Sequence, residues 1–262
     1  MPDSSLPPPP RPPPPPRPIP PPPGAEDHRL VYDHSVTWGL GDAWASLGIF
    51  FVISIVVGLV IYGLTAGPGL QGARLPLAVA IPPIAQGLYI WNVAGRKGRG
   101  LRLDFAFWAK PSDLGLGAAL AIAGMIGAGI VGAFMIWLFD SAPNASVADL
   151  AEESADGGGL TIWLVLLAVL ASTLVPVIEE LVFRGLWWSA LEKRGMKPHW
   201  ILLTTSFIFA AIHIEPQRSA VLFVLGLALG AGRLATGRLG PAIAAHAMIN
   251  SIGMLFLLIE LS

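Results

Sequence analysis

Residues 160–191 read LTIWLVLLAVLASTLVPVIEELVFRGLWWSAL, and the stretch begins as a long, predominantly apolar run. About 20 such residues suffice for a helix to cross a bilayer. Two adjacent glutamates and an arginine then follow within six residues, at Glu179, Glu180 and Arg184. Ionisable side chains at membrane depth are rare and usually paired or functional. The stretch therefore predicts a membrane-spanning helix with a polar group that needs a chemical explanation.

The whole chain has the composition of a membrane protein. It has 262 residues, of which 54% are hydrophobic and 13% are charged, whereas soluble domains carry about 25% charged residues. We interpret seven apolar segments as spanning helices, at 45–66, 75–95, 114–139, 160–190, 198–214, 219–235 and 239–260. The predicted fold is an all-α, polytopic transmembrane bundle, with the lipid bilayer as its surroundings.

The charges of the loops predict an orientation. The loops 96–110, 191–197 and 233–238 are basic, whereas the loop 140–159 holds acidic residues and no basic one. Basic loops stay on the cytoplasmic side of a membrane. Seven spans then put the N-terminus in the cytoplasm and the C-terminus outside. The Gly- and Ala-rich spans favour a prokaryotic plasma membrane.

The N-terminus has a different composition from the rest. Residues 1–23 read MPDSSLPPPPRPPPPPRPIPPPP, which lacks the apolar core of a signal peptide. We expect a disordered, proline-rich cytoplasmic tail over 1–40, followed by one helical domain over 41–262, and such a tail suits a proline-binding partner. The chain has no cysteine, which excludes a cysteine nucleophile and thiolate metal sites. It also has no basic stripe of the kind that binds nucleic acid.

Other apolar segments carry polar residues as well. The fifth contains FAAIH, ending at His213, and the seventh contains HAMIN, from His246 to Asn250. Glu180 and Arg184 are four residues apart and face each other on a helix, while Glu179 points about 100° away. Polar groups in lipid must turn inward and find partners, which predicts a shared cavity. The alternatives are a solvated helix end for the glutamates and ordinary packing roles for the histidines.

Three motifs in order resemble a known family. EELVFR (179–184), FAAIH (209–213) and HAMIN (246–250) are similar to the EExxxR, FxxxH and HxxxN motifs of the CAAX protease and bacteriocin-processing family, abbreviated CPBP and also called Abi. The resemblance covers about residues 160–255, which would form the protease core. The family core has eight helices, so an eighth span is the alternative to seven.

The resemblance implies an intramembrane endopeptidase that acts on membrane-associated proteins or peptides, either as a CAAX-type or as a bacteriocin-processing enzyme. It implies that Glu179, together with His213, activates a water molecule. His246 and Asn250 would stabilise the oxyanion, a role with a large electrostatic effect. Glu180 and Arg184 would hold the site together. We assign the remaining motif residue, Phe209, to substrate contact.

A metal is the open point of this interpretation. Members of the family have been described as metalloproteases, and Glu179, His213 and His246 could supply the three ligands of a catalytic zinc site. The sequence has no HExxH motif, however, and these residues come from different segments. We therefore favour a mechanism without a metal and expect no cofactor, with Zn²⁺ as the alternative.

Two other functions are compatible with buried polar residues. One is a non-catalytic scaffold or immunity protein that regulates a partner membrane protein. The other is a transporter or proton relay, although the halves of the chain show no inverted repeat. A catalytic cluster also requires the fifth segment to end deep in the protein, so we expect the following IEPQRS (214–219) to form a buried turn that lines the cavity.

Overall fold

The computed structural model describes residues 36–64, 71–139 and 161–261. Most of the predicted proline-rich tail and the acidic loop that was placed outside the membrane are not within these ranges. The described residues form helices joined by short loops, with no strand among them. Its elements are α1 (Leu40–Leu64), the 3₁₀ turn η2 (Gln71–Ala73), α2 (Arg74–Lys97), α3 (Leu101–Asp104), α4 (Ser112–Phe139), α6 (Ile162–Ser172), α7 (Leu174–Glu180), the π-helical segment η3 (Leu181–Trp187), α8 (Trp188–Glu192), α9 (Pro198–Ile212), α10 (Ser219–Thr236) and α11 (Gly240–Glu260).

The predicted all-α membrane bundle is confirmed. Within the described residues, 6 helices are long and apolar enough to cross a membrane, which indicates an integral membrane protein. Each of the seven predicted segments corresponds to a helix. The fifth, α9, has only 15 residues, about 22 Å at 1.5 Å per residue. It is therefore too short to cross a hydrocarbon core of about 30 Å in a straight path.

The segment that contains EELVFR is a helix in four pieces. α6 ends at Ser172, and the backbone departs from helical geometry at Thr173, with φ −122° and ψ −65°. Pro176 follows three residues later, and its missing N–H and bulky ring disrupt the preceding turn. The helix then widens into the π-helical segment η3 before it returns to α geometry in α8.

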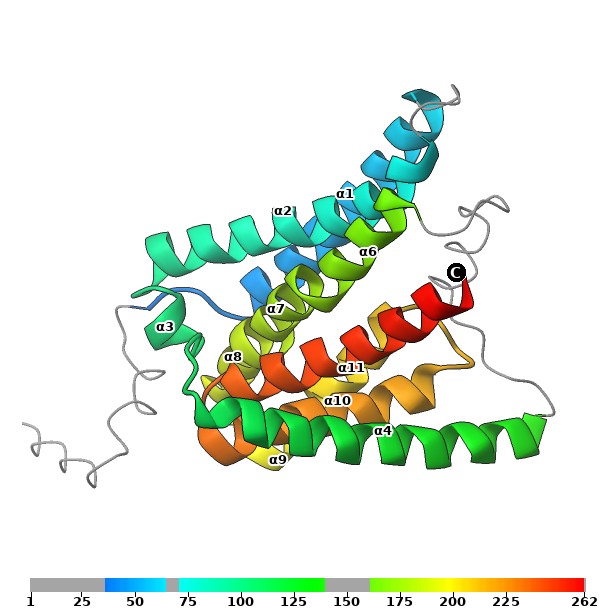
Figure 1. Ribbon diagram of the computed structural model, residues 1–262. Helices are drawn as coiled ribbons and strands as arrows, with labels where there is room; N and C mark the ends of the chain where they lie inside the picture. Colours follow the sequence, from blue (N-terminus) through cyan, green and yellow to red (C-terminus); the bar gives the residue numbers. More distant parts are fainter. Residues whose placement is uncertain (1–35, 65–70, 140–160, 262) are drawn as a thin grey trace, which may run out of the picture.

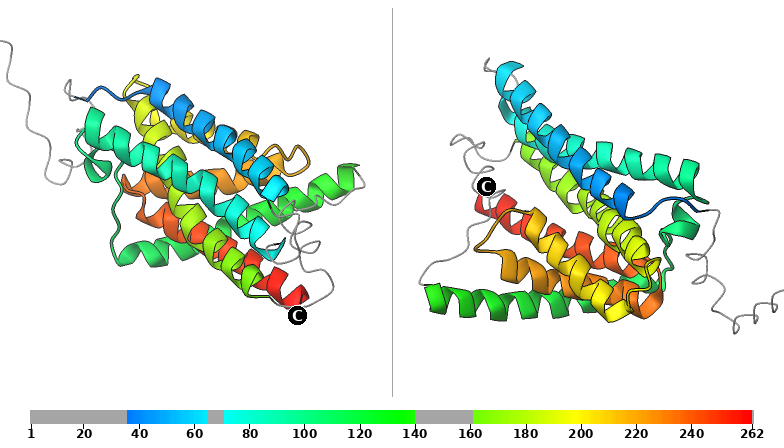
Figure 2. Two further views of the ribbon diagram at one scale, coloured as in Figure 1. Left: turned by 90° about the horizontal axis from the view of Figure 1, so that it is seen from above. Right: turned by 180° about the vertical axis from the view of Figure 1, so that it is seen from behind.

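This broken helix runs through the interior of the bundle. α1 and α2 pack together on one side of it, α4 lies on the opposite side of the bundle, and α10 and α11 fill the space between (Figures 1 and 2). η3 contacts α1, α2 and α9 as well as its own neighbours α7 and α8. All residues from Glu180 to Leu191 are buried. Solvent does not reach the side chains of a helix that is buried on every side. The polar residues of this stretch must therefore find their hydrogen-bond and ion-pair partners within the protein.

The three basic loops meet at one end of the bundle. Arg238 forms an ion pair with Asp113 at the start of α4, and Lys193 donates to the backbone oxygens of Val36 and Trp38 at 2.8 and 2.7 Å. The backbone N–H of Leu239 donates to the oxygen of Ala106 at 3.0 Å. The ends of α2, α8 and α10 and the starts of α4 and α11 gather at the left of Figure 1. The assignment of this end to the cytoplasm stays a prediction.

Glycines allow α10 to approach its neighbours closely. A Cβ atom on Gly226 would lie 3.0 Å from Cβ and 3.1 Å from Cα of Ser206 in α9, and one on Gly124 would lie 2.9 Å from Cβ of Ala228. In contrast, a Cβ atom on Gly129 would meet nothing within 4 Å. Small residues at helix contacts are the usual way to bring membrane helices together. Gly124 of α4 and Gly226 of α10 therefore serve packing.

We predict that Gly226→Ala lowers the stability of the protein. The added methyl group would lie 3.1 Å from Cα and 3.3 Å from the backbone oxygen of Ser206 in α9. These backbone atoms cannot rotate away, and overpacking costs about 1–3 kcal/mol. The expected result is a fall of several degrees in the apparent Tm, measured by thermal unfolding in detergent. Gly129→Ala is the matched control and should leave the apparent Tm unchanged or slightly raised. Equal effects from both variants would contradict the packing interpretation.

Candidate active site

Glu180 and Arg184 form a fully buried ion pair at the junction of α7 and η3. Both side chains are 0% exposed, and Nη1 of Arg184 lies 2.9 Å from Oε1 of Glu180. Nη2 of Arg184 donates to the backbone oxygen of Gly226 in α10 at 2.7 Å. The guanidinium also lies over the ring of Phe209 in α9, at 5.0 Å from its centroid. The predicted ion pair is therefore present, and it connects the broken helix to α9 and α10.

His246 lies between the two glutamates. Its Nδ1 atom is 2.8 Å from Oε1 of Glu180, a hydrogen-bond distance. Its Nε2 atom is 3.7 Å from Oε2 of Glu179, which is too long for a direct hydrogen bond. The His246 side chain is 7% exposed and that of Glu179 is 20% exposed. One carboxylate is thus enclosed and holds the imidazole, while the other remains accessible beside the second ring nitrogen.

The π-helical segment contributes to this geometry. π-helical turns are rare and occur often at functional sites, and η3 carries Arg184 on a stretch that is buried on every side. Oε2 of Glu180 and Nε of Arg184 are buried without a hydrogen-bond partner among the described residues. Unsatisfied buried polar atoms are costly in a membrane interior. They are tolerated here because their other atoms form the network that holds His246.

Phe209 is the centre of an aromatic cluster. Its ring is 2% exposed and lies 4.7 Å from the His213 ring, 5.8 Å from the His246 ring and 5.4 Å from the Phe183 ring, between centroids. Phe209 therefore connects the two histidines of the predicted site. The ring is enclosed by protein, so its predicted contact with a substrate stays a prediction.

His213 and Asn250 lie beside this cluster with other partners. Nδ1 of His213 is 2.6 Å from the backbone oxygen of Phe209, and Nδ2 of Asn250 donates to the backbone oxygen of Ala171 in α6 at 2.9 Å. An amide group has a second N–H, so this bond leaves Asn250 with a donor. The structure thus brings Glu179, Glu180, Arg184 and His246 into direct proximity, joins His213 to them through Phe209, and anchors Asn250 to α6.

Part of the chain is similar to a known protein family. Residues 161–252 match the family described as type II CAAX prenyl endopeptidase Rce1-like. The matched region is less than half of the chain, and the description of the family names an endopeptidase. The matched region includes all three motifs and every residue of the cluster around His246.

A protein of Escherichia coli named "Uncharacterized 24.3 kDa protein" is 32% identical over 87 residues. The matched part is 32% of this chain and 40% of that relative. The match therefore spans less than half of the length of the curated relative. No solved structure matches.

The arrangement of Glu179, His213 and His246 does not fit the zinc site that the sequence suggested as an alternative. The described residues hold no group of three or more His, Asp or Glu side chains arranged to bind a metal ion. A catalytic zinc ion needs three protein ligands at about 2.0–2.2 Å. Here one ring nitrogen of His246 faces Glu180, and Nδ1 of His213 faces a backbone oxygen. The part of the chain that the structure describes therefore does not support a metalloprotease.

One expectation about the segment after His213 is wrong. IEPQRS does not form a buried turn: Ile214 is 72% exposed, and Pro216 and Gln217 are exposed as well. α9 reaches the cluster because it ends after 15 residues. Ile214 has φ +54°, a left-handed conformation that is strained for a β-branched residue. Strain of this kind is found at functional sites, and here it directly follows His213.

The sequence did not reveal two parts of the site. The backbone oxygen of Gly226 accepts a hydrogen bond from Arg184, but a glycine in an apolar helix indicates only close packing. Glu180 was assigned to hold Arg184, and the structure adds that it also contacts His246. Helical spacing relates residues of one segment, whereas this contact joins two segments that are 66 positions apart.

Proposed function

We propose that the chain is an intramembrane endopeptidase that hydrolyses peptide bonds of membrane-associated proteins or peptides, with Glu179 as the general base. The observation that carries this proposal is the placement of His246, with Nδ1 against the buried Glu180 and Nε2 beside the accessible Glu179. A base next to an imidazole that is oriented by a third group is a recurring arrangement in hydrolytic sites. The match to a peptidase family supports the same reaction class.

The proposed reaction begins with a water molecule held by Glu179. The carboxylate takes one proton of the water while its oxygen attacks the scissile carbonyl carbon. The carbonyl oxygen then bears the negative charge of the tetrahedral intermediate. When the C–N bond breaks, Glu179 returns the proton to the leaving nitrogen, so that the products are a carboxylic acid and an amine. Transfer of the acid's proton to the amine then gives a carboxylate and an ammonium group. General acid–base catalysis of this kind contributes about 10²–10⁴-fold to a rate.

His246 and Asn250 are proposed to bind the oxyanion. Glu180 fixes the orientation of the His246 ring by accepting from Nδ1–H, which leaves Nε2 facing the reacting groups. Nε2 can donate to the oxyanion only in the imidazolium form, in which both ring nitrogens carry a proton. Asn250 holds one N–H against Ala171 and would offer the other. Donors that are oriented before the reaction stabilise developing charge without reorganisation. His213 is proposed to assist Glu179 in activating the water, and its contact with Phe209 fixes its position.

Phe209→Leu should reduce activity more than it reduces stability. Leucine preserves an apolar side chain in the buried position, but it removes the ring that contacts both histidines and lies under Arg184. We expect a fall in kcat with little change in KM, and a partial recovery in Phe209→Tyr if the added hydroxyl is accommodated. The rates would be measured on a fluorogenic peptide in detergent. A change in KM alone would instead support the predicted contact of Phe209 with the substrate.

The substrate class is proposed from the Rce1-like match and is tested by paired peptides. Each pair would have one sequence, with and without a prenyl group on a cysteine near the C-terminus. Faster cleavage of the prenylated member, after the modified cysteine, would support a CAAX-type enzyme. Cleavage of unmodified peptides alone would support the bacteriocin-processing type. If no peptide is cleaved by the wild-type protein, the scaffold alternative is favoured over the enzyme.

The orientation and location remain parts of the proposal. The basic loops gather at one end of the described bundle, and by the positive-inside rule this end would face the cytoplasm. That orientation places the N-terminal tail in the cytoplasm, where a proline-binding partner could reach it. We propose a prokaryotic plasma membrane, on the composition of the spans. Protease accessibility of the tail in inside-out and right-side-out vesicles would test the orientation.

A further inference from the structure

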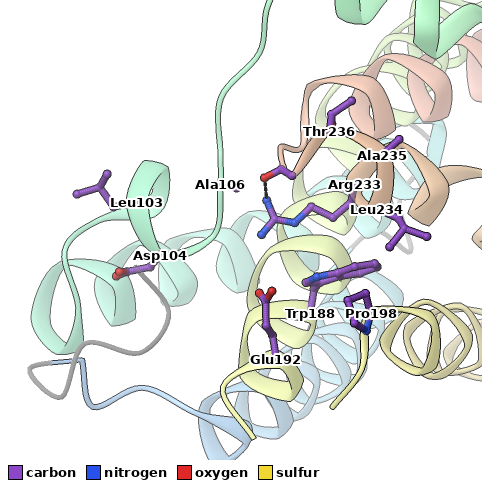
Figure 3. A pocket seen from close by; sticks show the side chains of 11 residues that line it. Leu103, Asp104, Ala106, Trp188, Glu192, Pro198, Arg233, Leu234, Ala235 and Thr236 are labelled. Atoms are coloured by element: carbon purple, nitrogen blue, oxygen red, sulfur yellow. Dashed lines mark hydrogen bonds between the residues drawn. The ribbon is translucent and has the colours of Figure 1, made fainter. Parts of the chain in front are cut away.

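The helix α8 is the final piece of the broken helix that carries Glu179, Glu180 and Arg184. On one side α8 borders a cavity of about 310 Å³, which is lined by residues of α3, α8, α10 and the start of α9. Figure 3 shows Trp188 and Glu192 of α8 at the wall of this cavity. Neighbouring helices therefore do not pack against the whole of α8, and contacts on its other sides fix its position.

The segment before α1 binds the end of α8 directly, and we call its residues 36–39 the strap. Lys193, which follows α8, donates to the backbone oxygens of Val36 and Trp38 at 2.8 and 2.7 Å. Its Nζ atom also lies 4.8 Å from the centroid of the Trp38 ring. Hydrogen bonds from a charged donor are about twice as strong as those between neutral groups. Lys193 thus joins the end of the broken helix to the strap.

The strap is itself held by three other parts of the fold. The backbone N–H of Thr37 donates to the oxygen of Lys97, the last residue of α2, at 2.7 Å. Trp38 is fully buried, and its ring packs edge-on against Phe105, directly after α3, with 5.0 Å between the centroids. The backbone N–H of the last strap residue donates to the carboxylate of Asp42 in α1 at 3.0 Å. The strap therefore fastens the end of α8 to a frame formed by α1, α2 and the end of α3.

The π-helical segment η3 connects the orientation of α8 to the candidate site. A π turn joins residues five apart instead of four. A return of η3 to α geometry would therefore rotate α8 relative to α7 by about 100°, the angle per residue of an α-helix. Arg184 lies within η3, and in the observed register it reaches Glu180 and the backbone oxygen of Gly226. Because Glu180 also contacts His246, a change of register would break the network that orients the imidazole.

We propose that the strap locks the register of η3, with Lys193 as a positioning residue for the peptidase reaction. The bonds from Lys193 to the strap keep α8 from turning, and this holds Arg184 against Glu180. The expected effect on the rate rests on the proposed function, whereas the lock itself rests on these contacts alone. Misplacing a reacting group by 1 Å costs up to about 100-fold in rate. A loosened strap should therefore lower kcat.

The test is Lys193→Met in the full-length protein, assayed on a fluorogenic peptide in detergent. We expect kcat to fall about tenfold with KM unchanged, because the lock positions the catalytic groups and does not bind substrate. Lys193→Arg should recover most of the rate, since a guanidinium can donate to the same backbone oxygens. Lys197→Met removes an exposed lysine at the same end of the bundle. It is the matched control and should cleave at the wild-type rate.

Amide hydrogen exchange provides a readout that does not depend on catalysis. Peptides that cover residues 181–187 should exchange about tenfold faster in Lys193→Met than in the wild-type protein, because the π-helical segment opens more often. A lysine that only anchors the strap would raise exchange near residues 36–43 alone. Unchanged exchange over 181–187, or a wild-type kcat in Lys193→Met, would overturn the proposal. If the wild-type protein cleaves no peptide, the proposed function fails, and exchange over 181–187 still decides whether the strap holds η3.

Discussion

Replacing Glu179 by glutamine is expected to reduce peptide cleavage by about 10²–10⁴-fold, the contribution of a general base. Glutamine has nearly the same shape as glutamate but cannot accept a proton from water at neutral pH. The Glu179 side chain is 20% exposed and makes no hydrogen bond to His246, so its replacement should not disturb folding. The loss should appear in kcat, with little change in KM, because the base acts in the transition state.

Two controls accompany this variant. The apparent Tm of Glu179→Gln should lie within a few degrees of the wild-type value, which would separate lost chemistry from lost structure. Glu260→Gln, a matched change at the end of α11, should retain full activity. Cleavage by Glu179→Gln at the wild-type rate would exclude Glu179 as the base.

Arg184→Met is expected to cause the largest loss of stability. Removing one partner of a buried ion pair costs about 3–5 kcal/mol, because the other charge is left without compensation. In this protein the change leaves Glu180, which is 0% exposed, without its ion-pair partner. It also removes the hydrogen-bond donor of the backbone oxygen of Gly226. A domain of 150–250 residues loses about 2–4 °C of Tm per kcal/mol. We therefore expect an apparent Tm lower by about 10 °C, measured by thermal unfolding in detergent.

Arg218→Met is the matched control for this effect. Arg218 forms an ion pair with Glu215, but the two side chains are 28% and 16% exposed. Partly exposed pairs contribute about 0–1 kcal/mol, so the apparent Tm should fall by no more than a few degrees. Combining Arg184→Met with Glu180→Leu should restore part of the stability, because no isolated buried charge remains. The recovery should be incomplete, because His246 loses its hydrogen-bond partner Glu180. If the two arginine variants had equal effects, the buried pair would not have the structural role assigned to it.

Much of the fold could be predicted because membrane helices are long, continuous and apolar. Each of the seven predicted segments corresponds to helical structure, and most ends lie close to the predicted ends, as for 239–260 and Gly240–Glu260. The internal structure of the 160–190 segment could not be predicted in the same way. The break at Thr173 and the π-helical turn after Glu180 depend on how this segment packs against α1, α2 and α9.

The candidate site was predictable where residues share one helix. The spacing of Glu180 and Arg184 indicated the ion pair that the structure contains. Contacts between helices were harder to predict. His246 was predicted to lie near the glutamates, but its position between them depends on how α11 packs against α7. The short length of α9 indicated that His213 ends inside the bundle, yet the exposed turn that follows was predicted to be buried.

The most direct test of the central claim is the cleavage of a quenched-fluorescent peptide library by the purified wild-type protein and by Glu179→Gln, each with and without a strong chelator. We predict cleavage by the wild-type protein at the same rate in both conditions, and a rate at least about 100-fold lower in the variant. Wild-type cleavage that is lost with the chelator and restored by zinc would contradict the metal-free mechanism. Cleavage that survives in Glu179→Gln, or a wild-type protein that cleaves no peptide, would contradict the account of the site.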